Sequence, residues 1–210
     1  RELRFTRILA DGATIEGAVA FVEHYRRFAA PLRLARGCLD QPLALRVSVL
    51  DCGRSFAPAS LDEAQHATLP EVSARWGSAY ALTPGDLFCV RVDNTSQLGL
   101  YVTVLLCENV GTVRVLGSRI HLRPRGSHML WCGEELGAPF MATLSPGASH
   151  ELDQIVAVGT TDAGASLDGL AVTETFFESQ GGTRRTMAID VGSPAEAWTA
   201  ATAAIRTAVR

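Results

Sequence analysis

The sequence predicts a mainly β fold, an antiparallel, immunoglobulin-like β-sandwich with flanking N- and C-terminal helices; an α+β arrangement is the near alternative. About eight short apolar segments recur along the chain at regular spacing and are separated by turn residues. Several of these segments alternate apolar and polar side chains, which is typical of strands with one buried face. Near both ends of the chain, apolar residues recur every three or four positions, as on one face of a helix.

The segment Gly85–Leu116, GDLFCVRVDNTSQLGLYVTVLLCENVGTVRVL, is the part against which we expect the rest of the chain to pack. Phe88, Val90 and Val92 share one face of its first arm, and LYVTVLLC repeats the two-residue period in the second arm. The polar residues Asp93–Gln97 favour a turn between the arms, because short polar side chains can bond the local backbone. A second reversal at the later NVG sequence completes three consecutive strands, so we expect an antiparallel meander.

Helices are predicted at both ends. Within Thr14–Ala30 the apolar residues recur at helical spacing, and charged residues largely occupy the other sectors. Pro31 suits the first turn of a second, short helix that ends near Gly37, where glycine can adopt a C-cap conformation. A last helix is predicted over Ser193–Val209, with serine as N-cap, proline after it, and a stripe formed by Trp198, Ala201, Ile205 and Val209.

The other apolar segments are predicted strands. The connection Cys52–Pro84 is weakly patterned, and we expect a long loop with at most a turn or two of helix. The chain then divides into an N-terminal helical segment (1–42), a β-sandwich domain (43–178), and a loop with a C-terminal helix packed on the sandwich (179–210). The predicted strands outside the central segment are Leu43–Asp51, Ile120–Leu122, Met129–Cys132, Pro139–Leu144, Glu151–Thr160 and Leu170–Glu178.

Composition narrows the classes of function. The net charge of -3 provides no basic field for a phosphate backbone, so we expect no nucleic-acid partner. All 19 basic residues are arginine, which excludes a Schiff-base lysine. Five widely spaced cysteines without a CxxC favour free thiols in a reducing cytoplasm.

No apolar run approaches the ~20 residues that cross a bilayer, and no signal peptide opens the chain, so we expect no membrane partner. Because the chain begins with Arg1 rather than methionine, we expect a piece of a longer protein.

One cysteine has histidines close to it in sequence: Cys132, with His121 and His128. A neutral imidazole can take a thiol proton, as in cysteine hydrolases, but none of the cysteines lies in a recognised nucleophile motif. Two loop histidines beside a buried thiol are the favoured interpretation. The histidine spacing does not match a metal site, and Gly159–Gly169 lacks both GxGxxG and a Walker lysine. We therefore assign no catalytic, cofactor-binding or metal-binding residue.

Two features are candidates for contact with other proteins. The Gly-rich segment SQGGTRRT contains Arg184 and Arg185, which an Arg-directed protease could cut; a solvated charge pair at a loop tip is the favoured alternative. Trp131 could be an exposed anchor for a partner, although tryptophan is more often part of the core.

The order of segments from about Leu43 to Phe177 is distinctive. A strand LALRVSVLD is followed, after a long connection, by ALTPGDLFCVRVDN and LGLYVTVLLCENVGTVRVLG, and later by MLWCGEELGAPFMATLSPG and ELDQIVAVGTT. With its Pro-Gly-Asp strand start, Asn-Val-Gly turn and Gly-Thr-Thr strand end, this order resembles the uncharacterised β-sandwich domain that follows the peptidase domain in many bacterial caspase-like (metacaspase-type) proteins.

The resemblance implies an accessory module, because the catalytic His and Cys of that family lie in a separate peptidase domain and no residue here matches them. Our first hypothesis is a non-catalytic regulatory or interaction domain, whose partner is a caspase-like peptidase domain in the same chain or as a processed chain. The second is a Cys-dependent hydrolase that uses Cys132 with His121 or His128. The third is a stand-alone sandwich that binds a ligand or effector. The oligomeric state stays open.

Overall fold

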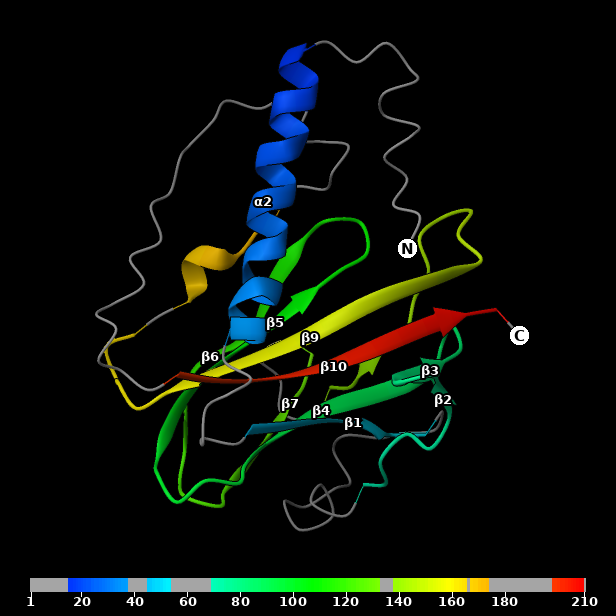
Figure 1. Ribbon diagram of the computed structural model, residues 1–210. Coiled ribbons are helices and arrows are strands. Elements are labelled where there is room, and N and C mark those ends of the chain that lie inside the picture. The colour runs from blue at the N-terminus through cyan, green and yellow to red at the C-terminus, as the bar shows by residue number, and fades with distance from the viewer. Residues whose placement is uncertain are drawn as a thin grey trace.

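The computed structural model describes residues 15–37, 45–53, 69–132, 138–165, 167–173 and 198–209. These residues form two β-sheets that lie face to face without closing into a barrel, and one helix that covers the outer face of the larger sheet (Figure 1). The predicted mainly β, sandwich-like fold with an N-terminal helix is therefore confirmed.

The helix α2 spans Ile15–Gly37. The smaller sheet has the strand order β1-β4-β7, with β8 also paired to β4, and the larger sheet has the order β2-β3-β10-β9-β5-β6. The described strand pairs are antiparallel except β3 with β10, which are parallel. The strands are β1 Leu45–Asp51, β2 Arg75–Trp76, β3 Ala79–Leu82, β4 Leu87–Asn94, β5 Leu100–Cys107, β6 Val113–Leu122, β7 Ser127–Leu130, β8 Phe140–Met141, β9 His150–Thr160 and β10 Trp198–Ala208.

The central segment forms three strands, as predicted, but they are not one meander. β4 pairs with β1, β7 and β8 in the smaller sheet, whereas β5 and β6 pair with each other in the larger sheet. The buried Asn94 fixes the crossing, because its side-chain amide donates to the carbonyl oxygens of Leu98 at 2.7 Å and Arg123 at 3.0 Å. Its side-chain oxygen accepts from the backbone N–H of Ser96 at 3.0 Å. The turn prediction was right, and the pairing of the strands beside it was wrong.

The main core lies between the two sheets. Val90 and Val92 of β4 face Val102 and Val104 of β5 across the sandwich, and none of these four side chains is more than 1% exposed. Fully burying a side chain of this size contributes roughly 1.5–3 kcal/mol. The period of two therefore predicts correctly which residues of both strands face inward.

A second core lies between the larger sheet and α2. Leu105 of β5 and Val156 of β9 are fully buried there, and Phe28, Leu32 and Leu34 of the helix pack against this cluster. Because both faces of β5 and β9 are covered, their sequences TVLLC and IVAV are nearly continuous apolar runs instead of alternating ones.

The helix is one element, and Pro31 lies within it instead of opening a second helix. Its N-terminal half extends past the sheet (Figure 1), so the stripe expected to be buried is partly exposed, with Val22 64% accessible. The inward residues include Phe21 and His24, and a hydrogen bond of 2.9 Å joins the His24 Nε2 to the carbonyl oxygen of Gly111. The buried histidine thus ties α2 to the β5–β6 turn.

The predicted C-terminal helix is wrong where the structure describes it, because residues 198–208 form β10 in the middle of the larger sheet. The sequence WTAATAAIRTA is rich in alanine, which has the highest intrinsic helix propensity. β9 nevertheless pairs with all eleven residues of β10, and the alternate residues Thr199, Ala203 and Ile205 are buried. Tertiary pairing therefore overrides local propensity.

Two other expectations change. The connection expected to be a loop contains β2 and β3, both of which join the larger sheet. The predicted strand Leu170–Glu178 begins instead in a 3-10 turn, η2 (Asp168–Leu170), followed by one bridge between Val172 and Val113. Its positions from 174 onward lie outside the described residues.

Candidate binding notch

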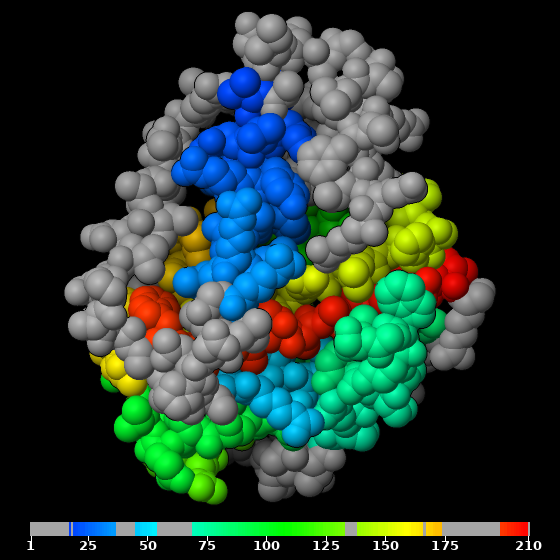
Figure 2. Space-filling model, in the orientation of Figure 1, coloured from blue at the N-terminus to red at the C-terminus, as the bar shows by residue number. Residues whose placement is uncertain are grey.

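The open side of the larger sheet holds the candidate site. β10 pairs with β9 from Trp198 to Ala208, but with β3 only from Ile205 to Thr207. On the β3 side, Thr202–Ala204 therefore have no strand partner among the described residues. A hollow of about 370 Å³ lies beside them, and we call it the β10 notch. In Figure 2, β10 (red) reaches the surface between α2 and the segment β1–β3.

Most of the surface that lines the β10 notch is polar, because its apolar residues are almost fully buried. Val47, Tyr80 and Ala203 line it and also belong to the core between the sheets. Ser78 on the β2–β3 turn and Gln154 of β9 add hydrogen-bonding groups. Polar groups that converge on a hollow can fix the orientation of a bound molecule by hydrogen bonds. Ala203 and Ala204, which have small side chains, line the hollow on its β10 side.

A polar cluster, the Glu71 cluster, lies at the same side and consists of Arg46, Glu71, Arg75 and Tyr80. The Tyr80 hydroxyl donates to Glu71 Oε1 at 2.6 Å, and Arg75 donates to the same oxygen at 2.6 Å. Arg46 donates to the other oxygen at 2.7 Å. The Arg75 guanidinium also stacks over the Tyr80 ring at 3.5 Å. Glu71 lies between β1 and β2, and its partners come from β1 (Arg46), β2 (Arg75) and β3 (Tyr80). The cluster therefore joins the edges of the two sheets.

The contacts of the Glu71 cluster set its charge. The Tyr80 hydrogen bond most strongly lowers the pKa of Glu71; partial burial opposes this effect, and both arginines add to it. Burial raises the pKa of the Tyr80 hydroxyl, and the neighbouring carboxylate raises it further. At neutral pH the cluster therefore holds one carboxylate, one neutral phenol and two guanidinium groups. The formal charge of the cluster is therefore about +1. Because Arg75 also lines the β10 notch, this charge favours an anionic group bound there.

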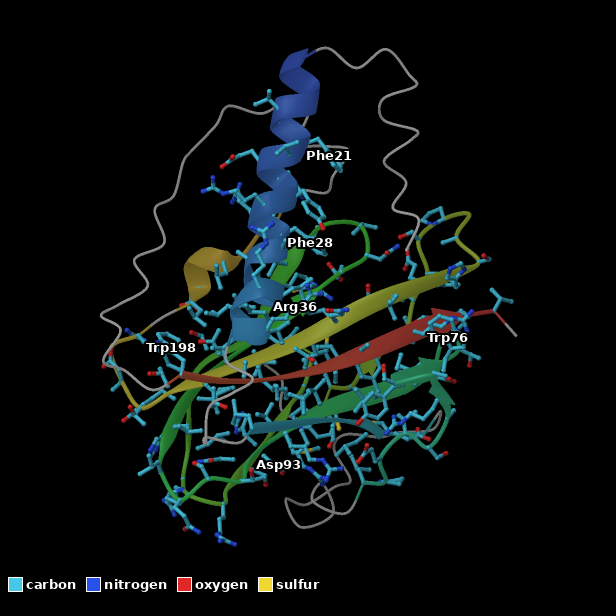
Figure 3. The ribbon with its side chains drawn as sticks, viewed as in Figure 1. Phe21, Phe28, Arg36, Trp76, Asp93 and Trp198 are labelled. Carbon is cyan, nitrogen blue, oxygen red and sulfur yellow. The ribbon has the colours of Figure 1, made fainter. Side chains whose placement is uncertain are left out.

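An exposed aromatic side chain lies next to this cluster in the sequence. Trp76 of β2 is 55% exposed, and the Arg206 guanidinium carbon lies 4.6 Å from the centre of its ring. The Nε of Arg206 is buried and has no hydrogen-bond partner among the described residues. Figure 3 shows Trp76 near the C-terminal end of β10, whereas Trp198 lies at the N-terminal end of this strand. An aromatic residue stacked with a guanidinium is typical of binding surfaces.

Sequence reasoning did not find this site. The segment EVSARWGSAY does combine charged and aromatic residues, and that composition is the signal that could have indicated it. The other wall of the β10 notch is β10 itself, which is more than a hundred residues away in sequence. Only the parallel pairing of β3 with β10 brings the two parts together.

The residues that the sequence did single out lie elsewhere. Trp131 is only 8% exposed and packs with Leu50, Cys52 and Cys89 on the smaller sheet, so it is a core residue and not an exposed anchor. Arg184 and Arg185 lie outside the described residues.

The proposed dyad is not assembled. Cys132 is exposed, whereas His121 stacks on the ring of Tyr101 at 4.9 Å in the larger sheet. His128 pairs with Val92 in the smaller sheet. No hydrogen bond joins Cys132 to either imidazole in the part of the chain that the structure describes.

The described residues include no group of three histidine, cysteine or acidic side chains that could hold a metal ion. Within the same ranges, no helix has both the length and the apolar character needed to cross a membrane. No family model, curated protein or solved structure matches the chain.

Proposed function

We propose that this chain is a non-catalytic interaction domain of a bacterial caspase-like cysteine peptidase system, and that it binds its partner through the β10 notch. The observation that carries the proposal is the β10 notch itself, where hydrogen-bonding side chains lie beside a stretch of β10 that has no strand partner on this side among the described residues. The order of segments, which resembles the domain that follows such peptidases, supports the choice of partner. In this role the domain regulates the peptidase, recruits its substrate or mediates assembly in the cytoplasm.

The chemistry of the Glu71 cluster favours binding over catalysis. A general acid or base works best when its pKa lies near the operating pH. The pKa of Glu71 is lowered and that of Tyr80 is raised, so both move away from neutrality. Neither group is suited to proton transfer near pH 7. Both are suited to holding a fixed pattern of charge and hydrogen bonds.

The partner is tested by titrating the chain into a purified caspase-like peptidase domain in a calorimeter. We expect saturable binding with a one-to-one stoichiometry. The chain alone is also assayed on Arg-containing peptides, where we expect no turnover. Robust turnover that a Cys132→Ala substitution abolishes would overturn the proposal.

A stand-alone ligand-binding sandwich is the second candidate, because about 370 Å³ lies within the size range of small-molecule pockets. Melting temperatures measured with a panel of small organic anions discriminate the two candidates. A concentration-dependent rise with one anion, and no binding to the peptidase domain, favours the small ligand.

The proposed partner also bears on Arg184 and Arg185. In a processed system, we expect the peptidase to cut SQGGTRRT after one of these arginines. Mass spectrometry of the chain after prolonged incubation with the active peptidase checks this expectation, and an intact chain contradicts it.

A further inference from the structure

We infer that the β10 notch takes an extended segment of the partner polypeptide, which carries an acidic residue and adds a strand to the larger sheet beside β10. The inference rests on the proposed function and names the kind of ligand that its site binds.

The main chain of β10 provides the first reason. On the β3 side, β10 is paired at Ile205–Thr207 and unpaired at Thr202–Ala204 among the described residues. These three unpaired residues span roughly 10 Å of strand edge. A free edge presents alternating N–H and C=O groups, and adding an extended peptide to such an edge is a common mode of recognition.

The shape of the notch provides the second reason. The Ser78 turn closes one end of the space beside β10, and Val47 of β1 lies across it. A strand placed there continues the plane of β3 and turns alternate side chains toward Val47 and Tyr80, which belong to the core between the sheets. Ala203 of β10 faces the same side as Val47 and Tyr80 and occupies little of that space. A ligand without a repeating main chain could fill the hollow, but it would not pair with the backbone N–H and C=O groups of β10.

Charge provides the third reason. Glu71 is shared by two arginines, so the Glu71 cluster has a formal charge of about +1 at neutral pH. Arg75 lines the β10 notch and is partly exposed there. A glutamate or aspartate in the bound segment is complementary to this charge, whereas a lysine at the same place is repelled.

Fluorescence anisotropy with a labelled hexapeptide tests the inference. The probe is acetyl-Thr-Val-Glu-Val-Thr-Val-amide, a β-prone sequence with one acidic residue. Two matched probes differ from it, one by lysine in place of glutamate and one by N-methylation of alternate main-chain nitrogens. We expect saturable binding of the first probe and binding weaker by at least about tenfold for each of the others.

Variants of the chain locate the binding. Ala204→Trp fills the β10 notch, and we expect it to weaken binding of the first probe by at least about tenfold. Ala208→Trp adds the same side chain to β10 beyond the segment paired with β3, and we expect a change of less than about twofold. If Ala204→Trp does not fold, Ser78→Trp fills the rim from an exposed turn without altering β10. Hydrogen exchange of the complex is expected to show new protection in residues 202–204.

The outcomes separate this inference from the proposed function. If the peptidase domain binds the wild-type chain and Ala204→Trp equally well, the interaction domain stands and strand addition is refuted. Equal binding of the glutamate and lysine probes overturns the acidic preference. If neither the peptidase domain nor the glutamate probe binds, both proposals fail.

Discussion

Glu71→Gln tests whether the Glu71 cluster holds the open side of the sandwich together by charge. Glutamine keeps an oxygen that can accept from Tyr80 at the present 2.6 Å, but it removes the charge that two arginines share. Replacing a charged acceptor with a neutral one costs about 1 kcal/mol. Because the arginine side chains are 57% and 37% exposed, solvent screens their ion pairs, which together contribute about 0.5–1 kcal/mol. The expected loss at pH 7 is about 1.5–2 kcal/mol.

The pH dependence distinguishes charge from shape. The pKa of Glu71 in the folded protein is below its ordinary value of 4.5. The ionised form therefore stabilises the fold fully above pH 4.5, and this contribution is lost as the pH falls through the lowered folded pKa. Glutamine lacks the contribution at every pH. The difference in free energy of unfolding between wild type and variant should therefore shrink steadily below pH 4.5.

Urea denaturation at pH 7, 5, 4 and 3 measures this difference, and the loss at pH 7 should lower the melting temperature by roughly 3–8 °C. Glu23→Gln on α2 is the matched control, since no ion pair joins Glu23 to a described residue. We expect less than about 0.5 kcal/mol from the control at each pH. A Glu71→Gln loss that is constant from pH 7 to pH 3 would refute the electrostatic reasoning.

Three further predictions concern other parts of the fold. Burial raises the pKa of Asp153 from its ordinary value of 3.8 to about 6. The protonated carboxyl group therefore stabilises the fold fully below pH 3.8, and this contribution is lost as the pH rises through about 6. Asp153→Asn should therefore be more stable than wild type by roughly 1–2 kcal/mol at pH 7 and equal to it below pH 3.8 in urea titrations; a variant that is less stable at pH 7 contradicts the sign. Leu105→Ala should cost about 2–5 kcal/mol because this fully buried side chain lies under α2, and the exposed Leu98→Ala should cost less than about 0.5 kcal/mol in the same assay. Alkylation followed by peptide mass mapping should label the exposed Cys132 rapidly. Burial raises the pKa of the Cys107 thiol to about 12, so Cys107 should stay unlabelled until the chain unfolds. Rapid labelling of both cysteines would show that α2 does not cover the sheet.

The inward faces of the strands follow from the sequence because alternation is a local property. A strand turns successive side chains to opposite faces. Val90 and Val92 therefore point into the core between the sheets, and Leu87 and Arg91 point to the other face of β4. Asn94 illustrates the limit of local information. Its neighbours predict a turn, but its bonds to Leu98 and Arg123 carry the chain into the other sheet.

The C-terminal segment shows the same limit more strongly. Thr202–Ala204 lie in an alanine-rich sequence that favours a helix when local propensity alone is considered. β9, about fifty residues earlier, supplies a complete row of hydrogen-bonding partners and turns this sequence into a strand. The β10 notch depends on that pairing, so the composition of EVSARWGSAY can indicate one wall of the notch but not the wall that β10 provides.

Composition and periodicity by themselves determined that this protein is mainly β, that a helix precedes its strands, and which side chains of the central strands are apolar and inward. Tertiary structure alone decided which sheet each strand joins, that residues 198–208 are a strand, and that Arg75 and Tyr80 meet Ala203 around one hollow. The physical reason is that side-chain alternation depends on neighbours in the chain, whereas strand pairing depends on hydrogen-bonding partners that are distant in sequence.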